Sequence, residues 1–147
     1  MKILLILNSF PTLSETFIIN KALGLSNIGH EVSVLIHKHS KNNGSESSKN
    51  LNKINIINSS MINPYLCAIK RLDIIIKAIY HYFFRSIPLR KNIKNMLMLS
   101  DLNSSKYDVI HFEFSGIAIN YIGVIGHLNS RVFVSCRGAA ELITPLI

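Results

Sequence analysis

The chain begins with an apolar segment, residues 1–7, that passes through a polar turn at 8–11 straight into a helix-like sequence. Thr12 and Glu15 have capping-box spacing, in which the hydroxyl accepts a helix N–H and the carboxylate reaches back to the cap. Gly29 supplies the permissive backbone that ends a helix. Between them, apolar residues recur at helical spacing at Phe17, Ile18, Ala22 and Leu25. A core strand, a loop and a helix in this order indicate an α/β fold.

Strand-like and helix-like segments continue to alternate along the rest of the chain. Further strands are predicted at residues 32–36, 54–57, 107–112 and 131–135. Helical segments are predicted at residues 64–83, 89–99 and 117–125. The polar stretch 38–53 is interpreted as a surface loop, because it has almost no apolar residue. The alternation predicts one α/β domain, a Rossmann-like doubly wound parallel sheet.

The composition is that of a globular chain with a surplus of positive charge. With 147 residues, 48% of them hydrophobic, it can build a core. Sixteen Lys and Arg against eight Asp and Glu give a net charge of +8, which attracts anionic partners. Cys67 and Cys136 have no metal-type spacing, so reduced thiols in a cytoplasmic protein are expected and a disulfide framework is not. No metal site is expected either, and five scattered histidines are assigned to loop or surface positions: His30, His37, His39, His81 and His127.

Neither a signal peptide nor a membrane span is predicted. The first apolar run is short and lacks a small-residue cleavage site. The most apolar long segment, residues 72–84, is interrupted by Asp73, Lys77 and His81, whereas a span needs about 20 apolar residues. Any membrane association is therefore expected to be peripheral, on the cytoplasmic face.

Three motifs, each at a predicted strand end, resemble the N-terminal domain of bacterial family 4 glycosyltransferases. They are Phe10-Pro11-x-x-Ser14-Glu15-Thr16-Phe17-Ile18, Asp108-Val109-Ile110-His111-Phe112-Glu113-Phe114 and Ser135-Cys136-Arg137-Gly138. The resemblance covers essentially the whole chain and is strongest to colanic-acid and lipopolysaccharide sugar transferases. It implies a GT-B architecture, in which two Rossmann-like domains face each other across a cleft. The resemblance implies that residues 1–147 are an incomplete acceptor-side domain, with the donor-binding domain absent.

The same resemblance implies a function. Such enzymes transfer a sugar from a nucleotide-sugar with retention of configuration and need no cofactor or metal. A carbohydrate or polyprenyl-linked acceptor is common among them. We therefore expect this chain to supply the acceptor-side half of a transferase of surface polysaccharide or lipopolysaccharide biosynthesis. The alternative is a truncated, non-catalytic product that only binds the acceptor or an anionic membrane surface. A flavodoxin-like binding domain is disfavoured, because no glycine-rich phosphate loop follows the first strand.

Candidate binding residues follow the first strand. Ligands of open α/β sheets bind outside the carboxyl ends of strands, and all three motifs sit at such ends. Ser9, Ser14 and Glu15 belong to a loop and helix start whose amides and hydroxyls can approach a phosphate or a sugar. The alternative is that Thr12 and Glu15 merely cap a helix.

His111 and Glu113 are the candidate catalytic pair. Side chains two residues apart project from the same side of an extended strand, so the imidazole and the carboxylate can pair or bind a sugar hydroxyl. Many relatives resemble His-x-His-Phe here, so Glu113 replaces a second imidazole. The alternative for His111 is a strand-terminal histidine that bonds backbone groups.

Arg137 and Gly138 are candidates for binding the donor phosphate. A guanidinium forms bidentate contacts with anions, and glycine permits close backbone approach. The alternative for Arg137 is a surface ion pair.

The basic helical region predicts a membrane-facing surface. Arg85, Arg90, Lys91 and Lys94 follow a segment rich in aromatic residues, a composition typical of interfacial helices on anionic lipid. The alternative is that the aromatic residues are core and the charges a solvated face. Nucleic acid is not expected as a partner, because no nucleic-acid-binding motif accompanies the charge.

Overall fold

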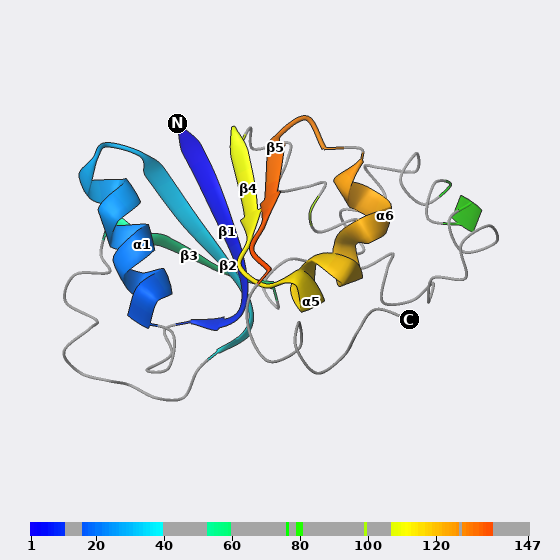
Figure 1. Ribbon diagram of the computed structural model, residues 1–147, viewed down its shortest axis with the longest axis horizontal. Helices are drawn as coiled ribbons and strands as arrows, with labels where there is room; N and C mark the ends of the chain where they lie inside the picture. Colours follow the sequence, from blue (N-terminus) through cyan, green and yellow to red (C-terminus); the bar gives the residue numbers. More distant parts are fainter. Residues whose placement is uncertain are drawn as a thin grey trace.

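The fold is a five-stranded parallel sheet with helices on both faces (Figure 1). The computed structural model describes residues 1–10, 16–39, 53–59, 76, 79–80, 99, 107–126 and 128–136. The strands are β1 (Lys2–Phe10), β2 (Glu31–His39), β3 (Asn55–Asn58), β4 (Val109–Phe112) and β5 (Arg131–Val134). Their order is β3-β2-β1-β4-β5, and every neighbouring pair is parallel. The predicted α/β, Rossmann-like class is confirmed.

Strand β1 lies at the centre of the sheet and is apolar on both sides. Ile3, Leu5 and Leu7 pack with buried residues of helix α1 (Thr16–Asn27). Leu4 and Ile6 point to the opposite face and pack against the helical segment that follows β4. A strand covered by helices on both faces reads as a continuous apolar run, which explains the opening sequence.

The segment after β4 covers the second face as three short pieces. These are α5 (Ser115–Ala118), the 3₁₀ turn η4 (Ile119–Tyr121) and α6 (Ile122–Ile125). The sequence predicted one helix over 117–125, and the structure differs by the 3₁₀ turn in the middle. Periodicity does not distinguish the two, because both conformations can turn Ile117 and Tyr121 toward the core.

The first two strands are longer than predicted. Residues 8–10 were expected in a turn and 38–39 in a loop, yet Ser9 pairs with Lys38 and Phe10 with His39. Phe10 is also 1% exposed in the core. Pairing and burial therefore override the turn preference of this stretch. The rest of the predicted loop and the expected helix start at Thr12 lie outside the described residues.

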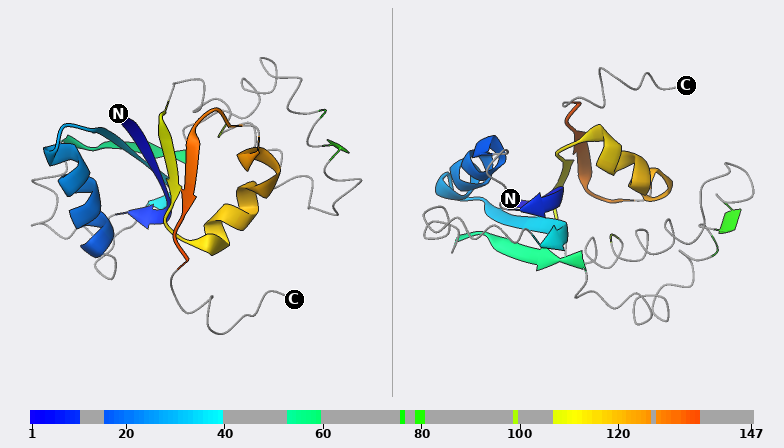
Figure 2. Two further views of the ribbon diagram at one scale, coloured as in Figure 1. Left: turned by 45° about the horizontal axis from the view of Figure 1, so that its top comes forward. Right: turned by 90° about the horizontal axis from the view of Figure 1, so that it is seen from below.

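Helix α1 ends as its glycine predicted. Gly29 has a φ of 91°, the left-handed conformation that favours glycine. The Gly29 N–H donates to the Ser26 carbonyl (3.1 Å) and the His30 N–H to the Leu25 carbonyl (3.1 Å), which is the Schellman pattern. The chain turns there and enters β2 beside β1. Figure 2 shows α1 and the α5–α6 segment apart from each other around the central strands.

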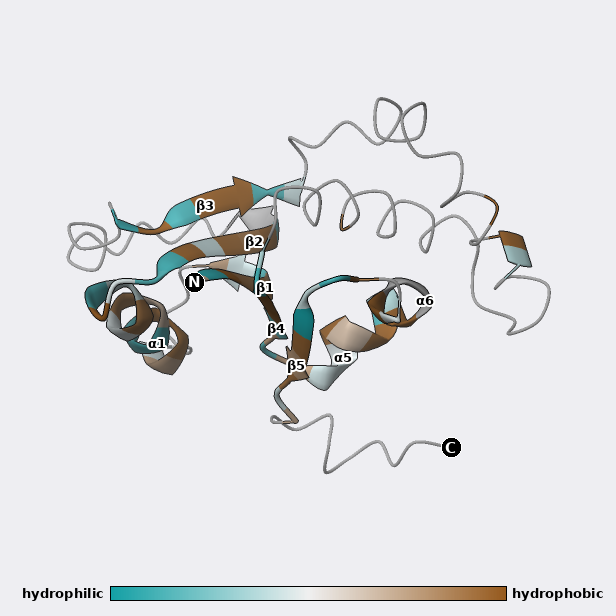
Figure 3. Ribbon diagram, turned by 90° about the horizontal axis from the view of Figure 1, so that it is seen from above, coloured by the Kyte–Doolittle hydropathy of each residue, from teal (hydrophilic) through white to brown (hydrophobic). Residues whose placement is uncertain are grey.

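The hydropathy of the strands follows this layering. In Figure 3, β2 and β3 carry hydrophobic stretches with hydrophilic residues beside them. Val34 and Ile36 of β2 pack on the α1 side, and Leu35 packs on the α5 side. The two cores are thus separated only by the sheet itself.

Shortening a central core side chain tests this arrangement. Leu5 is fully buried in β1, and we expect Leu5→Ala to lower the free energy of unfolding by about 2–5 kcal/mol. Ile28 is 70% exposed beyond α1, and Ile28→Ala is the control, with a change within about 0.5 kcal/mol. Urea unfolding followed by circular dichroism measures both. Equal effects of the two substitutions would contradict the central position of β1.

Candidate functional site

The candidate site lies where the strand order reverses, at the carboxyl ends of β1 and β4. Pairing continues just past the strands here. The Glu113 N–H donates to the Ile6 carbonyl (3.2 Å), and the Ser135 N–H donates to the Phe112 carbonyl (2.9 Å). Residues that follow β4 and β5 are therefore held on this edge by backbone hydrogen bonds. Open α/β sheets bind ligands at this position.

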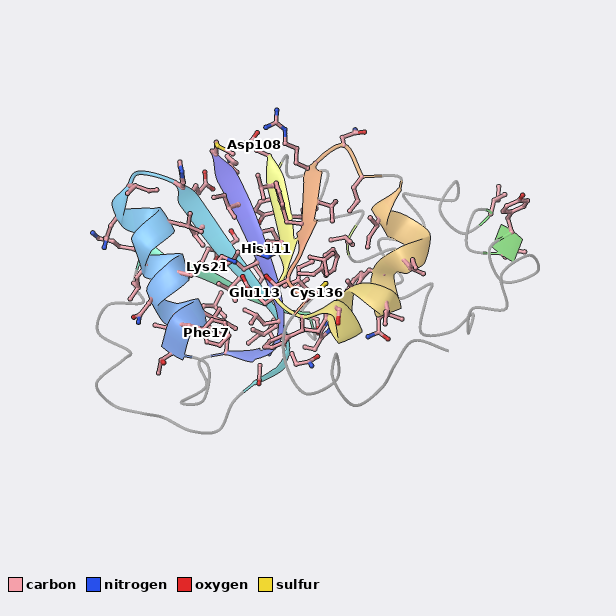
Figure 4. All side chains as sticks on the ribbon, in the orientation of Figure 1. Phe17, Lys21, Asp108, His111, Glu113 and Cys136 are labelled. Atoms are coloured by element: carbon pink, nitrogen blue, oxygen red, sulfur yellow. The ribbon has the colours of Figure 1, made fainter. Side chains whose placement is uncertain are left out.

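Four side chains form what we call the switch-point cluster: Lys21, His111, Glu113 and Ser135. Lys21 Nζ donates to Glu113 Oε1 (2.5 Å) and lies 2.6 Å from His111 Nδ1. His111 Nε2 lies 2.8 Å from Ser135 Oγ. Figure 4 shows Lys21 reaching from α1 toward His111 and Glu113 at the end of β4. The cluster thus joins α1 to the ends of β4 and β5, which lie 90 or more positions later in the sequence.

Burial within the cluster is uneven. The Glu113 side chain is fully buried, whereas 28% of the Lys21 and 19% of the His111 side chain is exposed. An ionised carboxylate inside a protein needs a charge partner, because the loss of hydration is costly. Lys21 provides that partner, so the ion pair fastens α1 to the end of β4. Glu113 is thus the enclosed member of the cluster, and Lys21, His111 and Ser135 are each partly exposed.

The predicted pairing of His111 and Glu113 agrees with this geometry. Nδ1 of His111 lies 3.6 Å from Oε1 of Glu113, on the α1 side of the sheet. Ser9 lies at the same edge, partly buried at the end of β1. The functional roles of these three residues remain predictions. The other candidates lie outside the described residues: Ser14, Glu15, Arg137, Gly138, Arg85, Arg90, Lys91 and Lys94.

Sequence reasoning missed Lys21 and Ser135. Lys21 lies three residues after Ile18 and one before Ala22, so it interrupts the apolar stripe by which α1 packs on the sheet. A lysine in such a stripe signals a buried acidic partner. Ser135 belongs to the motif Ser135-Cys136-Arg137-Gly138, in which only Arg137 and Gly138 were predicted to bind ligand. Its position directly after the predicted strand 131–135 could have indicated that Ser135 also lies at the ligand-binding edge.

A second polar contact occupies the other face of the sheet. The Tyr121 hydroxyl lies 2.8 Å from His37 Nε2, and the Tyr121 ring packs on Phe112 at 5.3 Å between centroids. Burial raises the pKa of Tyr121 above its usual value, so the phenol is neutral at physiological pH. His37 and His39 were expected in a loop or at the surface, and the structure places both in β2 and not in a loop. Pairing with β1 extends β2 through them.

Comparisons with known proteins provide no independent identification: no family model, no curated protein and no solved structure matches the chain. Among the described residues, no group of three or more His, Cys, Asp or Glu side chains could hold a metal ion. No described helix is long and apolar enough to cross a membrane. The site is therefore interpreted from its own geometry and from the motifs.

Removing the lysine tests the buried ion pair. We expect Lys21→Met to lower the free energy of unfolding by about 3 kcal/mol, because it removes the ammonium group that contacts the buried Glu113 carboxylate. The control is Lys2→Met, which breaks the Lys2–Glu31 pair. That pair is 3.3 Å long and about half exposed, and its loss should cost less than about 1 kcal/mol. Urea denaturation compares the two, and similar losses would contradict the pair's importance.

Proposed function

We propose that this chain is the acceptor-side portion of a retaining, nucleotide-sugar-dependent glycosyltransferase of surface polysaccharide or lipopolysaccharide biosynthesis. The supporting observation is the meeting of motif residues at one edge of the sheet. His111 and Ser135 are 24 positions apart in the sequence and make a direct side-chain contact. Ser9 is the second-to-last residue of the neighbouring strand β1. Residues of the second and third motifs thus meet at the edge where ligands bind in this fold class.

The side chains at this edge suit a hydroxyl-rich ligand. Ser135 and His111 supply polar groups that form hydrogen bonds to sugar oxygens. The ring of Phe133 meets His111 edge to face at 6.3 Å and is 53% exposed. An accessible aromatic ring beside a few fixed polar groups is typical of small-molecule binding sites. The ligand of this surface is, in our proposal, the carbohydrate or polyprenyl-linked acceptor.

The proposal assigns the nucleotide-sugar to a partner domain across the cleft. We therefore expect the isolated polypeptide to bind acceptor without transferring sugar. Detectable transfer by this polypeptide would instead assign the donor site to it. The competing proposal is a non-catalytic product that only binds the acceptor or an anionic membrane. Both proposals predict acceptor binding, but only the first predicts sugar transfer once a donor-binding domain is present.

Acceptor binding provides the direct test. The probes are a polyprenyl diphosphate carrying one N-acetylhexosamine and the same polyprenyl diphosphate without sugar, both in detergent micelles. We expect preference for the glycosylated probe. His111→Gln should weaken that binding about fivefold, since a hydrogen bond contributes about 1 kcal/mol.

The matched control is His30→Gln. His30 lies between α1 and β2, at the opposite edge of the sheet. Its substitution should leave the affinity for the glycosylated probe unchanged. Equal affinity for both probes, or equal behaviour of the two histidine variants, would refute the proposed acceptor site.

The membrane part of the proposal rests on exposed apolar residues near the basic segment. Ile76, Ile79 and Tyr80 are helical, with 68%, 42% and 58% of their surface exposed. Exposed apolar and aromatic groups next to positive charge are typical of helices that lie on anionic lipid. A lipid-linked acceptor would be presented at such a surface.

Charge removal tests this part separately. We expect weak binding to anionic phospholipid vesicles that falls as salt rises, and a large loss when Arg85, Arg90, Lys91 and Lys94 are replaced by Gln. A control variant with the same net charge carries Gln at Lys2, Lys41, Lys53 and Arg131. Vesicle cosedimentation compares them. Unchanged binding by the first variant, or equal loss in both, would exclude a localised membrane surface.

A further inference from the structure

The α1-side face of the sheet carries a row of side chains whose exposure rises toward β5. Strand pairing places Val34, Leu5, His111 and Phe133 next to one another in β2, β1, β4 and β5. Residues paired across neighbouring strands project from the same face of a sheet. Val34 and Leu5 are fully buried in the core with α1, 19% of the His111 side chain is exposed, and Phe133 is 53% exposed. The cover that α1 provides therefore ends before β5.

The two faces of β5 differ in their surroundings. Helices normally cover both faces of a parallel sheet, so its strands bury apolar side chains on each side. Val132 follows this rule and packs on the core under the α5–α6 segment. Phe133 points to the other face, and Figure 3 shows α1 beside β1 and β2 and away from β5. Half of the Phe133 surface thus meets solvent beside the switch-point cluster, at the edge where ligands bind.

The apolar surface at Phe133 is the size of one ring. A phenylalanine side chain has about 150–250 Å² of surface, so roughly 100 Å² is open here. A stable protein interface needs about 800 Å² from each partner. The described neighbours on this face are polar: Arg131 and Ser135 lie two positions away along the chain, and His111 lies beside the ring in β4. One aromatic ring with a polar border fits a small ligand better than a protein surface.

We propose that Phe133 is the stacking platform for the sugar of the acceptor, with the C–H face of a pyranose ring lying on the phenyl ring. A pyranose has C–H groups on its faces and hydroxyls around its rim. The negative π face of an aromatic ring attracts the partly positive hydrogens of such C–H groups. The rim hydroxyls then lie above the polar border, and the stacking contact needs no proton from His111 or Ser135. This inference rests on the proposed function and specifies a pyranose as the recognised part of the acceptor.

The contact with His111 restrains the platform before a ligand arrives. The two ring centroids are 6.3 Å apart, and the ring planes meet at 63°. This is an edge-to-face arrangement, one of the favoured geometries of aromatic pairs. A ring that is already held in place loses less conformational freedom when a ligand binds to it.

Binding by Phe133 variants tests the platform. The probes are the polyprenyl diphosphate with one N-acetylhexosamine and the same lipid without sugar, both in detergent micelles. We expect Phe133→Leu, which remains apolar but has no π face, to bind the glycosylated probe about fivefold more weakly. Phe133→Tyr keeps the ring and should bind like the wild type. The control is Val134→Ala, which should leave the affinity unchanged, because Val134 is also exposed on β5 but points to the opposite face.

Proton shifts of the bound sugar separate stacking from an indirect effect of the substitution. Protons that lie over the face of an aromatic ring resonate upfield. We expect upfield shifts of the sugar C–H protons when the glycosylated probe binds to the wild type, and their loss when it saturates Phe133→Leu. Equal shifts with both proteins would contradict the contact.

The remaining outcomes distinguish this inference from the proposed function. Unchanged affinity of Phe133→Leu for the glycosylated probe would overturn the platform alone. Equal weakening of both probes would also overturn it, because the ring would then contact the polyprenyl chain. Self-association that Phe133→Leu abolishes, with unchanged probe binding, would assign the ring to an interface between copies. A wild-type chain that does not distinguish the two probes would refute the proposed function and the platform together.

Discussion

The buried carboxylate of Glu113 is the constraint on which the arrangement of the site depends. It lies at the end of β4 with no exposed surface, so it requires a cation within direct contact. Lys21 meets that requirement because α1 packs over the α1-side core of the central strands. The ion pair therefore links the position of a helix to the end of a strand. Lys21 also contacts His111, and His111 contacts Ser135.

Strand alternation explains why the two faces of the sheet differ. Phe112 points into the core under the α5–α6 segment, while His111 and Glu113 point toward α1. The Tyr121–His37 contact lies on the α5 side and is built around a phenol that burial keeps neutral. One carboxyl edge thus carries an ionic cluster on one face and an aromatic contact with a neutral phenol on the other. The candidate catalytic residues His111 and Glu113 belong to the ionic cluster.

The features that depend on neighbouring residues in the chain were predicted correctly from the sequence. The apolar run of β1, the end of α1 at Gly29 and the common side of His111 and Glu113 follow from strand period and backbone freedom. The sequence-based prediction was wrong where contacts between distant residues determine the structure. One example is the extension of β1 and β2, which pair with each other beyond their predicted ends. Lys21 was missed for the same reason, because its partner is 92 positions away.

The coupling between Lys21 and Glu113 tests the central claim most directly. A double-mutant cycle with Lys21→Met, Glu113→Gln and both together separates the pair's interaction from the effect of each substitution alone. If the ion pair organises the site, the coupling measured by urea unfolding should be about 2 kcal/mol or more. A coupling below about 0.5 kcal/mol, as for an exposed surface pair, would contradict the account.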